Sequence, residues 1–199
     1  MPEFGRLSKT DSRTECMNGV YSYFMPCWGS FGADGFARIP ETLKSLKPVL
    51  SKKERFLGGM YDLNLKAYWE TDSDERWNIG LRQPLRRTAL FVTASKQPNI
   101  LSLTSLLNSK RKLAEAINGL DLLNLTIRQD GNHIELCFTP YGGGICFLIL
   151  PPVRYTVPLP PEQRNRMVWT IEQLATLICT SGYVKLGSHA TIPAHTNLI

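Results

Sequence analysis

The sequence predicts an α+β fold in which short antiparallel strands are followed by helices. Runs of alternating apolar and polar residues recur along the chain, as is typical of half-buried strands. Other runs repeat apolar residues at spacings of three and four, as is typical of helices. We therefore predict antiparallel sheet from two successive units, each with three strands and then a helix, over about residues 58–119 and 120–182. A short helix at 40–47, ended by Pro48, precedes them.

The first unit opens with a strand whose apolar residues alternate with polar ones. These residues are Leu63, Leu65, Ala67 and Trp69. The acidic segment 71–74 (TDSD) predicts a turn, and residues 77–81 alternate again. The apolar segment 88–94 (TALFVTA) supplies the third strand.

The helix of the first unit has an interrupted apolar face. Lys110 and Arg111 fall where apolar residues belong, so residues 100–118 form either one helix or two. In the second case, Asn108 or Ser109 is a candidate cap for the later helix.

The second unit begins with residues 122–138 (LLNLTIRQDGNHIELCF). Asp130-Gly131 is a dipeptide that favours a two-residue type I′ turn and predicts a hairpin. Its pairing places six apolar residues on one face, namely Leu123, Leu125, Ile127, Ile134, Leu136 and Phe138. The opposite face is polar, which is expected of an antiparallel sheet that is covered on one side only.

The rest of the second unit is a strand, a proline-rich connection and a helix. Residues 145–150 (ICFLIL) predict an interior strand. Pro160-Pro161 is suited to a helix start, because the first turn does not use those N–H groups. Gly182 is available to end that helix.

The domain organisation predicted is one core with two appendages. Residues 1–38 form an irregular arm rich in Gly and aromatic residues, 39–182 a single α+β domain, and 183–199 a weakly ordered tail. The likeness of DLNLK at 62–66 to LLNLT at 122–126 suggests a duplicated unit, although a series of short strands produces such echoes by chance.

Positive charge is concentrated in one segment. Residues 76–114 hold eight basic and no acidic residues, so the rest of the chain holds 15 basic and 17 acidic residues. This segment is either a solvated face or an anion-binding site. The anion-binding candidates are Arg82, Arg86, Arg87, Lys110, Arg111 and Lys112.

Signatures of catalysis, metals and cofactors are weak. The glycines at 142–144 are not followed by the Lys-Ser or Lys-Thr of a phosphate loop, and the acidic cluster at 70–75 lacks the glycine of a calcium loop. We therefore predict no metal and no cofactor. If a catalytic pocket exists, its candidates are His133, Tyr141 and Arg154.

Cysteines and apolar runs bear on location. The five cysteines show no metal-binding spacing and read as free thiols. The longest apolar run, 145–150, is far shorter than the roughly 20 residues of a membrane span. The first 16 residues have no apolar stretch typical of a secretory signal. We expect a cytoplasmic protein without a membrane span.

Three classes of function are consistent with the sequence. The leading hypothesis is a non-catalytic adaptor- or chaperone-like protein that binds another protein through a sheet face, edge or groove, with a homodimer left open. The predicted order of helices and strands resembles that of small secretion chaperones, by analogy of fold order alone. The alternative is binding of nucleic acid or another polyanion through 76–114. An enzyme of unknown class is third.

Overall fold

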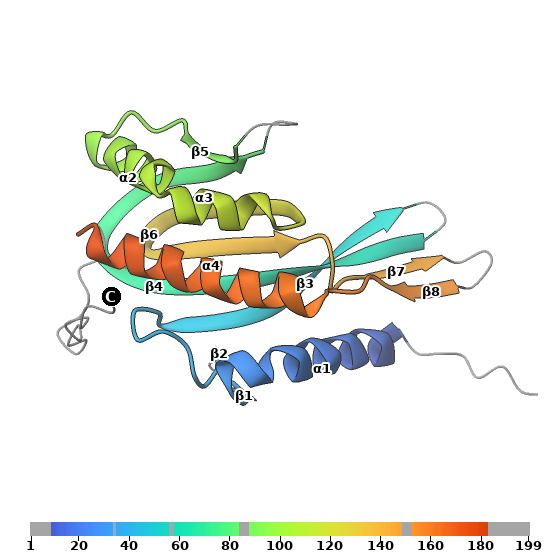
Figure 1. The fold of residues 1–199 in the computed structure, drawn as a ribbon. Helices are drawn as coiled ribbons and strands as arrows, with labels where there is room; N and C mark the ends of the chain where they lie inside the picture. The colour runs from blue at the N-terminus through green and yellow to red at the C-terminus, as the bar shows by residue number, and fades with distance from the viewer. Residues whose placement is uncertain (1–8, 34, 56–57, 84–87, 149–152, 183–199) are drawn as a thin grey trace, which may run out of the picture.

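The computed structural model describes residues 9–33, 35–55, 58–83, 88–148 and 153–182, and these residues form the predicted α+β fold (Figure 1). The helices in this part of the chain are α1 (Lys9–Trp28), α2 (Pro98–Ser109), α3 (Arg111–Asn118) and α4 (Pro161–Thr180). The strands are β1 (Phe31–Gly32), β2 (Gly35–Phe36), β3 (Ser45–Arg55), β4 (Gly58–Arg82), β5 (Leu90–Thr93), β6 (Leu122–Pro140), β7 (Ile145–Leu148) and β8 (Val153–Thr156).

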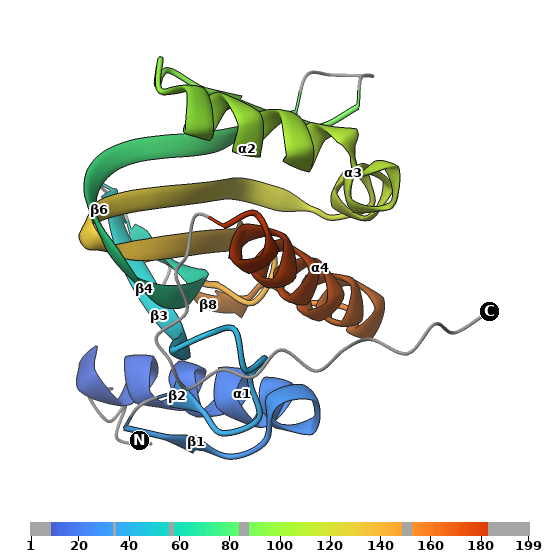
Figure 2. The same cartoon turned by 90° about the vertical axis from the view of Figure 1, so that its left-hand side faces the viewer.

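The long strand β4 organises the main sheet. It pairs antiparallel with β3, β5, β6 and β7, and β7 also pairs with β8. The interior position predicted for the strand at 145–150 is therefore confirmed for β7. Helices α2, α3 and α4 lie together on one side of the curved sheet, whereas α1 lies beside β3 at the other end of the molecule (Figure 2). The antiparallel sheet and its helical cover agree with the prediction.

Strand β6 reverses direction where the sequence predicts a turn. The ribbon of β6 bends back on itself (Figures 1 and 2), and Gly131, near the middle of the strand, has a φ of 66°. Strand β4 accompanies both arms of β6, because it pairs with residues 126–131 and again with 133–138. The reversal therefore lies within one continuous strand and has a partner strand on its outer side.

The acidic segment 71–74 is not the separate turn that we predicted. It belongs to β4, where the pairing register with β6 shifts between Glu70 and Glu75. Thr71 is buried. The irregularity follows from the bend, because the outer strand must span a longer path around the reversal than the inner one.

The predicted apolar face of residues 122–138 is largely confirmed. Leu125, Ile127, Ile134, Leu136 and Phe138 are fully buried in the core. Leu123 is the exception, with 45% of its surface exposed. It lies near the start of β6, three residues before the pairing with β4 begins at Thr126.

The helix predicted at 40–47 is wrong. Residues 45–55 form β3, in which Leu46, Pro48 and Leu50 are buried at alternate positions. Pro48 suggested a helix end, but an edge strand tolerates proline because one side of its backbone needs no partner. Among the described strands of the main sheet, β3 pairs with β4 alone.

The N-terminal helix of the structure is α1, within the segment that we expected to be an irregular arm. Gly19 and Pro26 obscure the helix in the sequence, because both residues disfavour helix interiors. Phe24 and Trp28 stack with ring centroids 5.1 Å apart and are fully buried. The aromatic residues therefore pack onto the core, as predicted, but they do so from a helix.

Residues 100–118 form two helices. Lys110 is extended (φ −86°, ψ 90°) and separates α2 from α3, and neither Asn108 nor Ser109 caps α3. Asn108 instead accepts a hydrogen bond from the Phe91 backbone N–H (2.8 Å) and donates one to the Phe91 carbonyl (2.9 Å). Asn118 accepts from the N–H of Ala89 (2.8 Å). These amides occupy the free edge of β5.

Helix α4 starts at Pro161 as predicted, and Gly182 follows it with a φ of 75°. Its buried residues belong to the same cluster as those of α1, α2, α3 and the sheet. The element order is β4, β5, α2, α3 in the first predicted unit and β6, β7, β8, α4 in the second. Both units place strands before helices, and the duplication remains a prediction. The tail at 183–199 lies outside the described residues.

Candidate functional site

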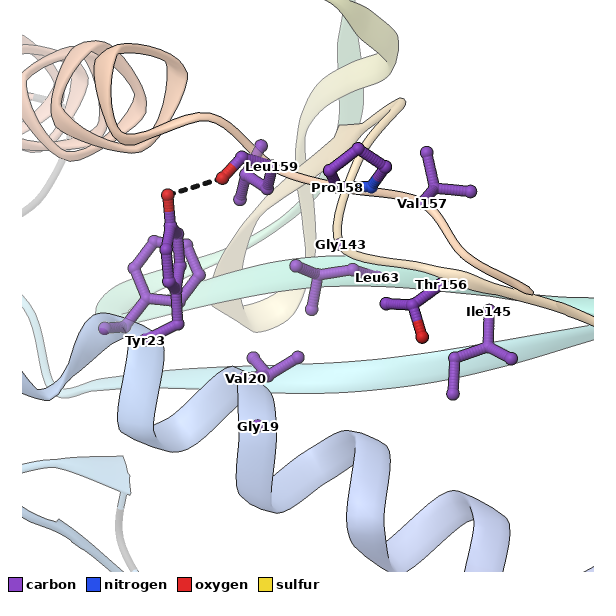
Figure 3. A pocket seen from close by; sticks show the side chains of 11 residues that line it. Gly19, Val20, Tyr23, Leu63, Gly143, Ile145, Thr156, Val157, Pro158 and Leu159 are labelled. Carbon is purple, nitrogen blue, oxygen red and sulfur yellow. Dashed lines mark hydrogen bonds between the residues drawn. The ribbon is translucent and has the colours of Figure 1, made fainter. Parts of the chain in front are cut away.

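An apolar cleft of about 560 Å³ lies between α1 and the chain segment that leads into α4 (Figure 3). Its lining residues share an uncharged character. They are Gly19, Val20, Tyr23, Phe24, Leu63, Gly143, Ile145, Thr156, Val157, Pro158 and Leu159. We call this hollow the α1 cleft.

Three separate parts of the chain build the α1 cleft. Gly19, Val20 and Tyr23 lie on α1 along one side, and the segment 156–159 runs along the other (Figure 3). Leu63 of β4 lies between them (Figure 3). The cleft is open to solvent, so that an occupant would remain partly outside it.

Tyr23 fastens α1 to the start of α4. Its hydroxyl donates a hydrogen bond to the Leu159 carbonyl (2.5 Å). The Arg164 guanidinium lies 4.8 Å from the ring centre and donates to the Tyr23 carbonyl (3.1 Å). Burial raises the pKa of Tyr23, so the hydroxyl stays protonated at neutral pH. Tyr23 is thus a fixed wall of the cleft.

The glycines at 142–144 are required by the approach of other backbone segments. A Cβ on Gly142 would lie 2.4 Å from the Pro158 carbonyl oxygen. Gly143 has a φ of 80° and donates its N–H to the Val157 carbonyl (2.9 Å). The loop therefore holds the 156–159 wall of the cleft against β7.

Of the predicted pocket candidates, His133 and Tyr141 lie apart. His133 lines a second, polar pocket that also contains Glu135. Tyr141 is 65% exposed and lies eight residues further along the chain, roughly 25 Å away at about 3.3 Å per residue of strand. Arg154 is on β8, and its side chain lies outside the described part of the structure.

Of the basic candidates, the structure describes Arg82 at the end of β4 and Lys110, Arg111 and Lys112 around the start of α3. Gln83, the residue after Arg82, donates a hydrogen bond to the Ile117 carbonyl in the last turn of α3. Arg82 is therefore near one end of α3 and Lys110 at the other, and an eight-residue helix spans about 12 Å. Lys110, Arg111 and Lys112 are exposed. Arg86 and Arg87 lie outside the described residues.

Neighbouring acids offset part of this positive charge. Arg111 pairs with Glu115 (2.7 Å), and Arg76 pairs with Asp130 (2.9 Å). Lys112 borders a shallow hollow that also contains Glu115 and Glu162. The segment 76–114 contains no acidic residue, but acidic side chains from other parts of the chain lie beside several of its basic residues.

Among the described residues, no three His, Cys, Asp or Glu side chains group as metal ligands. Cys27, Cys137, Cys146 and Cys179 are free thiols. Burial raises the pKa of Cys179 to about 11 and also raises that of Cys137, which makes both weak nucleophiles at neutral pH. Among the described helices, none is sufficiently long and apolar to cross a membrane.

Residues 34–178 match a family described as "Protein of unknown function (DUF3156)". The chain belongs to the DUF3156 family. The DUF3156 match includes the main sheet and α2 to α4 but begins after α1. No curated protein and no solved structure matches the chain.

The α1 cleft was not predicted from the sequence. Its residues come from 19–24, 63, 143–145 and 156–159, and no spacing in the sequence connects them. The one available signal was the pair of apolar residues Val157 and Leu159 among prolines, which we interpreted as an extended lead into a helix.

Proposed function

We propose that this protein is a non-catalytic binding protein, adaptor- or chaperone-like, that holds an apolar segment of another protein in the α1 cleft. The observation that carries the proposal is the lining itself, which is apolar and contains no charged side chain. Apolar side chains from a partner would leave water on entering it, at about 25 cal/mol per Å² buried.

The character of the cleft favours binding over catalysis. Tyr23 is the ionisable side chain among the lining residues, and its hydroxyl is engaged with Leu159. An open apolar cleft also suits a side chain that projects from a larger partner better than a small molecule that must be enclosed. In this proposal the protein acts in the cytoplasm, and a second copy of the chain is one candidate partner.

Filling the cleft tests the proposal directly. A Cβ on Gly19 would meet no atom within 4 Å, so Gly19→Trp adds bulk at the cleft without a backbone clash. The matched control is Asn18→Trp, which adds the same side chain to the exposed neighbouring position of α1. Peptides selected for binding from a random displayed library serve as the probe, with affinity measured by fluorescence anisotropy.

The expected peptides carry apolar side chains. We expect Gly19→Trp to weaken their binding at least tenfold and Asn18→Trp to change it less than twofold. Selection that yields no saturable apolar peptide, or an equal loss in both variants, would overturn the proposal.

The polyanion alternative rests on the eight basic residues of 76–114 and is distinguished by salt. Binding of single-stranded DNA should fall steeply between about 50 and 200 mM salt if phosphate contacts carry it. Replacing Arg86, Arg87, Lys110 and Arg111 with Ala should then abolish it. Apolar peptide binding in the α1 cleft should be nearly independent of salt.

A further inference from the structure

A second pocket, of about 440 Å³, lies on the other face of the sheet and is polar. Tyr68 of β4 lines this second pocket, and Leu63 of the same strand lines the α1 cleft. The two residues are five positions apart, and side chains an odd number of positions apart on a strand point to opposite faces of the sheet. We call it the polar pocket. It is lined by Lys44, Ser45, Tyr68, Arg128, Asp130, His133 and Glu135.

The base of the polar pocket is a buried carboxylate held by two cations. Glu135 is 8% exposed. Its Oε2 lies 3.0 Å from Lys66 Nζ, and its Oε1 lies 3.0 Å from an Arg128 guanidinium nitrogen. Arg128 and Glu135 belong to different arms of β6, so the reversal at Gly131 brings them together. Two positive groups on one carboxylate leave one positive charge in excess.

The protonation states at this base are fixed at neutral pH. Burial favours protonation of Glu135, but hydrogen bonds from Lys66 and Tyr68 and the charges of Lys66 and Arg128 outweigh it, so its pKa lies below the usual value. Burial, together with the hydrogen bond to Glu135, raises the pKa of Tyr68 to about 12. Glu135 is therefore a carboxylate that accepts from a neutral phenol.

The charges at the rim cancel in pairs. Lys44 is paired with Glu70, and Arg76 with Asp130. The excess positive charge at Glu135 is therefore not removed by the surrounding acids. Arg128 remains 57% exposed, and a guanidinium has five N–H donors, more than its contact with Glu135 uses. Exposed His133 adds a ring nitrogen at the same rim.

We propose that the polar pocket binds a small molecule through an oxyanion group, a phosphate or a carboxylate. Arg128 is the main ligand, because a guanidinium forms paired, charge-assisted hydrogen bonds with such groups. His133 contributes from the rim, and Glu135 is a positioning residue that orients Arg128. All of these residues lie within the DUF3156 match, and the site is independent of the α1 cleft.

Titration calorimetry with inorganic phosphate and, separately, with succinate tests this site and distinguishes the two anion sources. We expect saturable one-site binding of at least one anion to the full chain at low salt. Arg128→Ala should weaken it at least tenfold. The matched control, Arg38→Ala, removes the same charge from an exposed position outside the pocket and should change it less than twofold.

A rim variant keeps the test decisive if Arg128→Ala fails to fold. His133→Ala alters an exposed side chain, so the fold should persist, and we expect anion affinity to fall at least threefold. The proposal is overturned if neither anion saturates the wild-type chain, or if Arg38→Ala weakens binding as much as the pocket variants. In either case the peptide test of the α1 cleft stands unaffected.

Discussion

The structure places Glu135 in a more buried environment than the sequence predicted, and gives it partners that the sequence did not show. Alternation correctly assigned it to the polar face of residues 122–138, a face that we expected to lie in solvent. It is buried there because Lys66, Tyr68 and Arg128 surround its carboxylate. A buried carboxylate is stable only with such partners, since its desolvation is costly.

Glu135→Gln should therefore destabilise the protein, by about 1–3 kcal/mol at neutral pH, because two cations lose their counter-charge. The lowered pKa in the folded state gives Glu135 a stabilising contribution that is complete above the ordinary pKa of 4.5 and is lost as pH falls through the folded value. Chemical denaturation between pH 3 and 7 should show a flatter pH dependence for the variant.

The control for this prediction is Glu70→Gln. Glu70 pairs with Lys44 at the exposed rim, where water and salt screen the attraction. Its replacement should change the free energy of unfolding much less. Equal losses in the free energy of unfolding for the two variants would show that the buried ion pairs of Glu135 stabilise the protein no more than an exposed pair.

The long strands β4 and β6 show how an element differs from the short segments that periodicity detects. Each was predicted as two strands with a turn between them. The structure continues the pairing of β4 with β6 on both sides of the bend, so the irregular residues remain part of the strands. Local sequence marks where the backbone bends, whereas the pairing partner determines whether the strand ends there.

The bend of β6 depends on the left-handed backbone of Gly131. Gly131→Ala should cost about 1–2 kcal/mol, because an L residue is strained at a φ of 66°. Space is not the reason, since the nearest atom to an added Cβ is Asp74 Oδ1 at 3.4 Å. Thermal and chemical denaturation measure the loss.

Gly80→Ala is the matched control for Gly131→Ala. Gly80 lies in β4, opposite Thr126, and an added Cβ there meets no atom within 4 Å. This variant should be neutral or stabilising by about 0.5–1 kcal/mol, because alanine costs less backbone entropy than glycine in a strand. A loss in Gly80→Ala as large as in Gly131→Ala would contradict the role of the left-handed conformation.

At the scale of the whole molecule, α1 shares the core although it precedes the DUF3156 match. Val20, Phe24 and Trp28 belong to the same cluster of buried side chains as the sheet and α4. The α1 cleft exists because α1 packs beside the 156–159 segment. The stability of the core and the proposed binding site therefore both depend on this helix.

Phe24→Ala should lower the free energy of unfolding by about 3–5 kcal/mol, because it leaves a cavity beside Trp28. Met25→Ala is the adjacent control, at 43% exposure, and should change stability by no more than about 0.5 kcal/mol. Urea denaturation followed by tryptophan fluorescence compares them. A small effect of Phe24→Ala would show that α1 is not part of the cooperative core.

Local sequence patterns were enough to predict the α+β class, the apolar faces of the strands, the reversal at Asp130-Gly131 and the start of α4 at Pro161. These features arise from interactions between residues close in the chain, which periodicity and turn chemistry report. The three-dimensional packing was needed to show that Ser45–Arg55 is a strand, that β4 follows β6 around its bend, and that Tyr23, Leu63 and Leu159 share a cleft. Those outcomes depend on contacts between residues distant in sequence, which no local pattern records.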